Sequence, residues 1–192
     1  MAHLSQYLAA ILKCRRDIGG ISLVDFTDSA HPFEIAYFDR GPIDAKTIIL
    51  GGDWSAYWYN GFIYGSEIAR GLDVFKLVPS KFLTKNEIEA AGLVKVNELN
   101  VQNQQQIVWP SQLTVSLAYL DQLERSQALA PEKIADLRKA IERAQKSHMN
   151  KKDLAKLHEM SASVESEASS AKSPADTKRL HSLAQILQSP AA

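Results

Sequence analysis

The chain of 192 residues contains a single cysteine, Cys14, so no disulfide can form within it. Cys14 is better interpreted as a small apolar residue in an N-terminal segment than as a catalytic thiol. An excess of charge of either sign is also missing, since 22 basic side chains balance 22 acidic ones. A general nucleic-acid-binding protein needs a basic face, so no nucleic-acid partner is predicted.

Long hydrophobic runs are absent as well. No stretch approaches the roughly 20 apolar residues of a membrane-spanning helix, so no membrane span is predicted. Residues 1–13 lack the basic start and the cleavage site of a secretory signal peptide. If this segment is helical, Leu4, Leu8, Ile11 and Leu12 share one face of the helix. Residues 1–14 are therefore expected to form a loosely attached segment with an amphipathic helical turn or two.

The sequence also lacks the common catalytic motifs. It contains no His-Glu-x-x-His, Gly-x-Ser-x-Gly or phosphate-loop pattern. His148 and His158 stand ten residues apart, which is not the i, i+4 spacing of a helical metal pair. No catalytic residue, metal site or cofactor is predicted, and whether the protein is an enzyme stays open.

Short β-strands separated by turns are the pattern of residues 15–78. Strands are predicted at 21–26, 34–38, 47–50, 56–59, 62–65 and 72–77. Asn60-Gly61 is the clearest signal among the turns, because both central positions of a type I′ turn require a positive φ. The sequence therefore predicts antiparallel sheet with a two-residue hairpin turn at Asn60-Gly61.

The pattern changes to helical after Pro79. Thr84-Lys85-Asn86-Glu87 matches a capping box and predicts a helix over about 85–94. Further helices are predicted over 111–127, over 131–148, after an Asn150 cap, and over 174–188, with 161–173 loose. Their apolar stripes are expected to be buried together at Leu117, Leu120, Leu137 and Ile141. The fold class is predicted to be α+β.

An internal match links two of the predicted strands. Gly20–Phe26 can be laid over Gly71–Leu77, 51 residues later. A period of about 40–50 residues built from short strands is typical of β-propeller blades. A complete propeller needs at least four blades, and residues 15–79 supply at most about one and a half. Either the chain is the carboxy-terminal part of a longer protein, or its strands fold back under the helices.

These residues resemble the carboxy-terminal end of bacterial LVIVD-repeat proteins, a family of secreted or cell-surface β-propellers. Gly20–Asp28 resembles the core of the repeat, residues 29–38 resemble its continuation, and Trp58–Phe75 resembles the final blade. The tail after Pro79 is similar to the helical extension of some members.

The resemblance covers about residues 15–145 and has consequences for fold and location. It implies a partial β-propeller of one to two blades over 15–79, followed by a helical extension of three or four helices over 80–192. It also implies an extracellular or cell-surface location, although this chain carries no signal peptide.

Polar residues flank the final hairpin and form the candidate ligand site. Asp53, Glu67, Arg70 and Asp73 would lie near one rim of the blade, where they would bind a cation or a polar ligand. In the alternative interpretation, Arg70 and Glu67 pair with each other or with the backbone of the turn. No calcium-loop spacing is present.

Aromatic residues cluster in the same region. They are Trp54, Tyr57, Trp58, Tyr59, Phe62 and Tyr64. Packing between blades and across strands is the favoured interpretation of such a cluster. The alternative is that exposed aromatics stack on sugars or on side chains of a partner, and Trp58 is the candidate for that role.

The leading functional hypothesis is a non-catalytic protein-interaction or scaffold module, whose partners are other propeller blades or another protein. The alternative is a hydrolase or lyase with a site on the rim near Asp53, Glu67 and Arg70. Convergence of these three side chains in one open pocket would favour the enzyme. A partial propeller also leaves an apolar edge at Ile21, Leu23, Val24 and Phe26, so the isolated chain is expected to be poorly stable or to associate.

Overall fold

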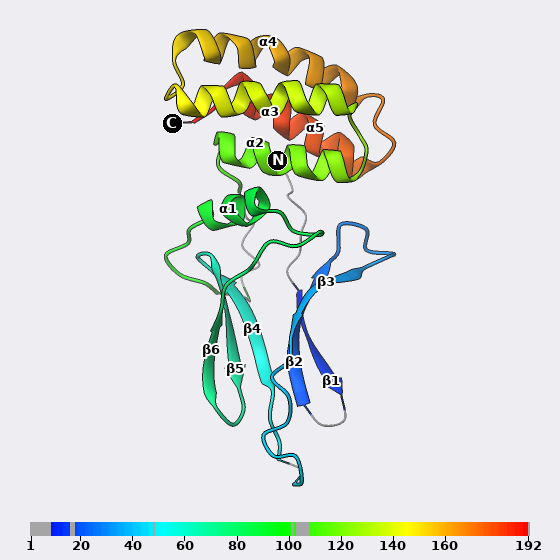
Figure 1. Cartoon of the computed structure of the whole chain (residues 1–192), viewed down its shortest axis with the longest axis vertical. Helices are drawn as coiled ribbons and strands as arrows, with labels where there is room; N and C mark the ends of the chain where they lie inside the picture. Colours follow the sequence, from blue (N-terminus) through cyan, green and yellow to red (C-terminus); the bar gives the residue numbers. More distant parts are fainter. Residues whose placement is uncertain (1–8, 16–17, 48, 101, 103–107, 192) are drawn as a thin grey trace. The chain divides into compact units, whose positions relative to one another are not determined.

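The computed structural model describes residues 9–15, 18–47, 49–100, 102 and 108–191. The fold class is α+β, as predicted, with antiparallel sheets followed by helices (Figure 1). The contacts divide the described residues into two compact units. The sheet unit holds those within 9–83 and 95–102, and the helical unit holds those within 84–94 and 108–191.

The first sheet has the strand order β1-β2-β3 and is antiparallel. Its strands are β1 (Ala9–Arg15), β2 (Ile18–Asp25) and β3 (Phe33–Phe38). The helical interpretation of the N-terminal segment is wrong for residues 9–12, which pair with β2. Pairing with β2 satisfies backbone groups that a short, isolated helical turn leaves partly unpaired. Residues 1–8 of that prediction lie outside the described residues.

The second sheet has the order β4-β5-β6 and is also antiparallel. Its strands are β4 (Asp53–Tyr59), β5 (Phe62–Glu67) and β6 (Gly71–Phe75). The predicted hairpin turn between β4 and β5 is confirmed, since Asn60 and Gly61 have φ values of 51° and 101°.

The strand predicted over residues 47–50 is wrong for residues 47, 49 and 50, which lie in irregular chain. The side chain of Asp44 accepts hydrogen bonds from the amides of Lys46 and Thr47, at 2.7 and 2.8 Å. This local turn uses backbone donors that a strand would offer to a neighbour.

The two sheets pack on each other within the sheet unit. Strand β4 lies against β1 and β2, and the rings of Phe38 and Phe75 stand 4.6 Å apart. Ile21 and Leu23 are buried, so the expectation that they would form an exposed apolar edge is wrong. The described strands close neither a barrel nor a propeller.

The helical unit contains five helices within its described residues. They are α1 (Lys85–Leu93), α2 (Leu113–Arg125), α3 (Pro131–Lys146), α4 (Lys151–Ala168) and α5 (Pro174–Gln188). The capping box at Thr84 and Glu87 and the Asn150 cap are both confirmed. Helix α4 continues to Ala168, so the loose segment predicted from residue 161 is wrong over its first half. Burial of Val164 and Ala168 in the core stabilises this stretch as helix.

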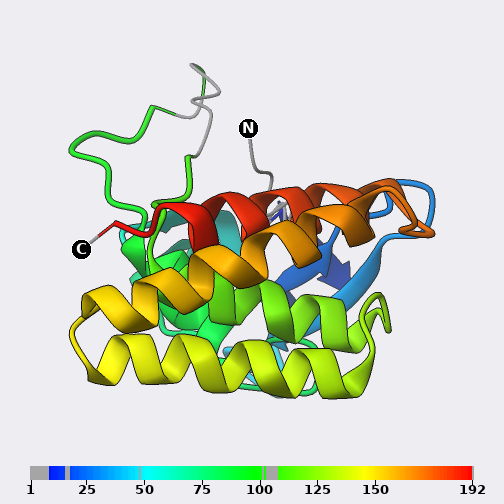
Figure 2. The same cartoon turned by 90° about the horizontal axis from the view of Figure 1, so that it is seen from above.

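The core of the helical unit lies between α2, α3, α4 and α5. Neighbouring helices pack in chain order and α5 returns to α2 (Figures 1 and 2). The predicted joint burial is confirmed for Leu117, Leu120, Leu137 and Ile141. Helix α1 is tied to α2 by the ion pair of Glu87 with Arg125, at 2.6 Å. None of the described helices has the length and apolarity that crossing a membrane requires.

Candidate functional site

The predicted ligand-site residues lie on the second sheet and on the turn that follows β5. Asp53 and Glu67 are register partners at the ends of β4 and β5, and Arg70 lies in the β5–β6 turn. The carboxylates do not face solvent, because Asp53 is 3% exposed and Glu67 is 5% exposed. Asp53, Glu67 and Arg70 therefore lie near one another on the second sheet, but the two carboxylates are buried and do not open onto a pocket.

Glu67 organises the turn between β5 and β6. Its carboxylate accepts hydrogen bonds from the amides of Gly52 and Ala69, both at 2.8 Å, and from the amide of Arg70. The guanidinium of Arg70 lies 3.5 Å from the same carboxylate. These bonds, with that of Gly52 the largest, hold the pKa of Glu67 below its usual value. The alternative interpretation, a Glu67–Arg70 pair at the turn, is thus the arrangement found.

Asp53 has the opposite electrostatic environment. Its Oδ1 atom is buried and finds no hydrogen-bond partner among the described residues. Burial raises the pKa of Asp53, and the nearby carboxylates of Asp73 and Glu67 raise it further. The side chain fits only because Gly65 has no Cβ, which would overlap Oδ1. Asp53 is thus a buried carboxyl group with one oxygen left without a hydrogen bond among the described residues.

Arg40 is the residue of this cluster that sequence reasoning missed. Its guanidinium donates to Asp73 at 2.7 Å and lies over the ring of Phe38, 5.4 Å from the centroid. The bond with Asp73 raises the pKa of Arg40. The sequence gives no signal for this contact, since the two residues are 33 positions apart and meet only when the sheets pack.

Paired acids with pKa values shifted in opposite directions are typical of general acid–base sites. Here, however, a substrate would have to reach carboxylates that the sheets cover. Among the residues that the structure describes, no group of three or more His, Cys, Asp or Glu side chains is placed to hold a metal ion. Trp58 is half-buried and pairs with Ile63 on the side of the sheet that carries Gly65. The sheets therefore enclose these carboxylates and do not present them to a substrate.

The side of the second sheet that faces away from the first sheet, called the outer face, has a different composition. Side chains alternate along a strand, so this face carries Tyr57, Tyr59, Phe62, Tyr64, Leu72 and Val74. Leu72 is 68% exposed and Val74 is 54% exposed. Trp54, at the bulge that begins β4, is 70% exposed. Tyr57 and Phe62 pair across the strands with Tyr64 and Tyr59, as the favoured interpretation expected, but burial as core is wrong for Trp54, Tyr57 and Phe62.

A hollow of about 380 Å³ lies on the outer face. It is lined by Tyr57, Tyr59, Tyr64 and Leu99. Leu99 belongs to a segment that the hairpin holds in place: Asn60 exchanges two hydrogen bonds with the backbone of Val96, at 3.0 and 2.9 Å. The hydroxyl of Tyr59 donates to the carbonyl of Asn97 at 3.1 Å. The hollow is thus a fixed, tyrosine-rich depression on an apolar surface.

The chain matches no family model, no curated protein and no solved structure. The outer face and the buried cluster are therefore interpreted from their own geometry and chemistry.

Proposed function

We propose that the protein is a non-catalytic interaction module and that the outer face of the second sheet receives a β-sheet of a partner. The observation that carries this proposal is the row of exposed apolar side chains on that face, above all Leu72 and Val74. Isolated exposed apolar residues are ordinary, but a contiguous patch of them marks an interaction surface. Tyrosines suit such a surface because each offers a large apolar ring and a polar tip.

The arrangement of the two sheets supports a partial β-propeller as the scaffold of this module. Both sheets are antiparallel and have three strands, and β4 of the second lies against β1 and β2 of the first, which suits neighbouring propeller blades. The matching strands β2 and β6 each follow a hairpin partner, β1 and β5. Strand β3 then pairs with the far edge of β2, whereas no described strand pairs with the far edge of β6.

The partner is therefore a sheet that covers the outer face, with a strand able to pair with the free edge of β6. A further propeller blade meets both requirements, because propeller blades usually have four strands and stack face against face. The LVIVD-like residues in β2 and in β4 to β6 support this proposal. They also support a cell-surface or extracellular location.

Self-association of the full chain tests the proposal. When no other sheet is present, the outer faces of two copies should cover each other, and sedimentation velocity should show a dimer that forms as concentration rises. Replacing both Leu72 and Val74 by lysine should raise the dissociation constant at least about tenfold. Each buried aliphatic side chain contributes about 1.5–3 kcal/mol, and about 1.4 kcal/mol is a factor of ten.

Tyr37→Lys is the matched control, because Tyr37 is an exposed apolar residue on the first sheet. This variant should associate as the native chain does. A native chain that stays monomeric at every concentration would contradict the proposal. Association that the Leu72 and Val74 substitutions leave unchanged would contradict it too.

A further inference from the structure

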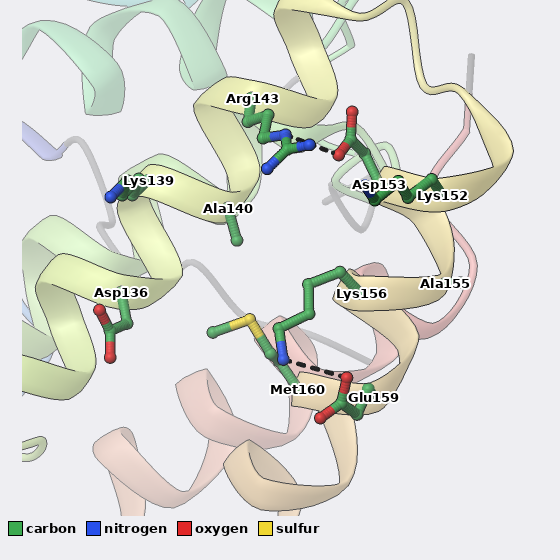
Figure 3. A pocket seen from close by; sticks show the side chains of 10 residues that line it. All are labelled: Asp136, Lys139, Ala140, Arg143, Lys152, Asp153, Ala155, Lys156, Glu159 and Met160. Atoms are coloured by element: carbon green, nitrogen blue, oxygen red, sulfur yellow. Dashed lines mark hydrogen bonds and ion pairs between the residues drawn. The ribbon is translucent and has the colours of Figure 1, made fainter.

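A second surface feature lies entirely within the helical unit, between α3 and α4. The two helices form an antiparallel hairpin (Figure 2). A groove of about 640 Å³ lies along this hairpin, and Figure 3 shows the side chains that line it. Ala140 and Met160 are directed into this space, as Figure 3 shows. Small and flexible apolar side chains thus form the floor of the groove, where a larger side chain could be received.

The rims of the groove carry one more basic than acidic side chain. Lys139, Arg143, Lys152 and Lys156 line it, against Asp136, Asp153 and Glu159. Two of the acids are already matched, because Arg143 pairs with Asp153 at 2.9 Å and Lys156 pairs with Glu159 at 3.0 Å. Lys139 and Lys152 form no ion pair with any described residue and are exposed.

The charge extends beyond the groove along the hairpin. Residues 136–159, which span the groove, contain seven lysines and arginines and four carboxylates. This excess is local, because the whole chain has no net charge. Lys146 and Lys151, on either side of the hairpin turn, are exposed like Lys139 and Lys152. The hairpin around the groove therefore carries an excess of basic side chains, which would attract a negatively charged partner.

We propose that this groove binds an acidic amphipathic helix of a partner protein. The floor requires an apolar stripe, and the rims require carboxylates on both sides of that stripe. A helix provides this pattern, since residues at i, i+3, i+4 and i+7 share one face and acids can flank them. From Asp136 to Arg143 the groove follows α3 for about 10 Å, which is roughly two helical turns.

Other anionic ligands fit the groove less well. A nucleic acid would use the lysines but would leave the apolar floor at Ala140 and Met160 without a partner. A membrane surface would require a more uniformly basic face than these mixed rims provide. Both are outcomes that the experiment distinguishes from a helix.

Fluorescence anisotropy with the full chain provides the test. The probe is a labelled synthetic peptide of about 15 residues, with leucines on one helical face and glutamates on both flanks. We expect saturable binding that weakens as sodium chloride rises from about 50 to 300 mM, because the rim charges are exposed and screened. A peptide with the same composition in scrambled order should bind at least about tenfold more weakly, since it presents no apolar stripe.

Two variants locate the binding. Lys139→Glu combined with Lys152→Glu should weaken it at least about tenfold, because two attractive contacts become repulsive. Met160→Glu should weaken it by a similar factor by placing a charge on the floor. Lys178→Glu is the matched control, since Lys178 is exposed on α5 outside the groove, and its affinity should stay within about twofold of the native value. Circular dichroism verifies that each variant keeps its helices.

Three results would overturn the proposal. They are no binding of the amphipathic peptide at low salt, equal binding of the scrambled peptide, and tighter binding of duplex DNA or phosphatidylserine vesicles than of the peptide. None of these depends on the outer face of the second sheet. The Leu72 and Val74 variants keep the peptide affinity if the two surfaces act independently.

Discussion

At the scale of single residues, the sheet unit contains two buried carboxyl groups with opposite environments. Glu67 is held by three backbone amides, which lower its pKa, whereas Asp53 Oδ1 has no hydrogen bond and its pKa is raised. Stability therefore depends on pH in opposite ways at these two positions.

Asp53→Asn should stabilise the protein at neutral pH. The folded protein holds the Asp53 proton more tightly than the unfolded chain does, so stability falls as pH rises from the ordinary carboxyl range through the raised pKa. The asparagine cannot ionise and avoids this loss. Thermal unfolding of the native and variant proteins should show a higher Tm for the variant at pH 7, and a difference that shrinks near pH 3.

Glu67→Gln is the companion variant, and its expected effect on stability at neutral pH is opposite to that of Asp53→Asn. The lowered pKa gives stability that is present above the ordinary carboxyl range and is lost as pH falls through that lowered pKa. The glutamine variant should therefore melt below the native protein at pH 7 and approach it in acid. Equal pH profiles for both variants would show that the two environments do not differ as described.

At the scale of elements, polar contacts fix where helix α1 begins and how it meets α2. Thr84 accepts a hydrogen bond from the amide of Glu87 at 3.2 Å, and its hydroxyl donates to Asp121 at 2.6 Å. Asp121 also accepts from Asn86 and Arg138, at 2.8 and 2.7 Å. The capping threonine thus serves both the helix and its packing.

Thr84→Ala should destabilise the helical unit by about 0.5–2 kcal/mol, the usual cost of losing an N-cap. We expect a cost in the upper part of this range, because the alanine also removes the hydrogen bond from the Thr84 hydroxyl to Asp121. Urea unfolding followed by circular dichroism at 222 nm measures the change. Thr84→Ser keeps the hydroxyl and should retain most of the stability. A serine variant as weak as the alanine variant would assign the effect to the lost methyl group.

At the scale of the whole molecule, the helical unit contains all residues of its own core. Among the described residues, the core cluster runs from Ala90 to Leu187 and includes no residue of the sheet unit. A fragment of residues 84–192 should therefore fold without the sheets. We expect it to keep its helical circular dichroism and to unfold in one cooperative transition.

Leu120→Ala in that fragment provides the control for specific packing. Leu120 is fully buried in the core, so its truncation should cost about 2–5 kcal/mol. A fragment that lacks helical signal would show that its core needs the sheet unit. A fragment insensitive to Leu120→Ala would show that its helices form without the packing seen here.

The elements that depend on residues adjacent in the sequence could be predicted from the sequence. The Asn60-Gly61 turn, the Thr84 capping box, the Asn150 cap and the helix over 174–188 were all predicted, because each is determined by local backbone requirements. Helical periodicity also identified the core leucines of α2 and α3, because the apolar stripe of an amphipathic helix is buried against the core.

Tertiary structure decided what depends on contacts between distant residues. Strand β1 exists because β2 pairs with it, and Arg40 meets Asp73 only where the sheets pack. The alternation of residues in β4, β5 and β6 did not reveal which face would be covered, because both faces carry apolar side chains. The first sheet covers the face with Gly65 and Asp53, and this choice leaves Leu72 and Val74 exposed. The sequence alone thus determined the locally specified turns, caps and most of the helices, whereas the packing of sheets and helices decided strand β1 and which side chains are available to a partner.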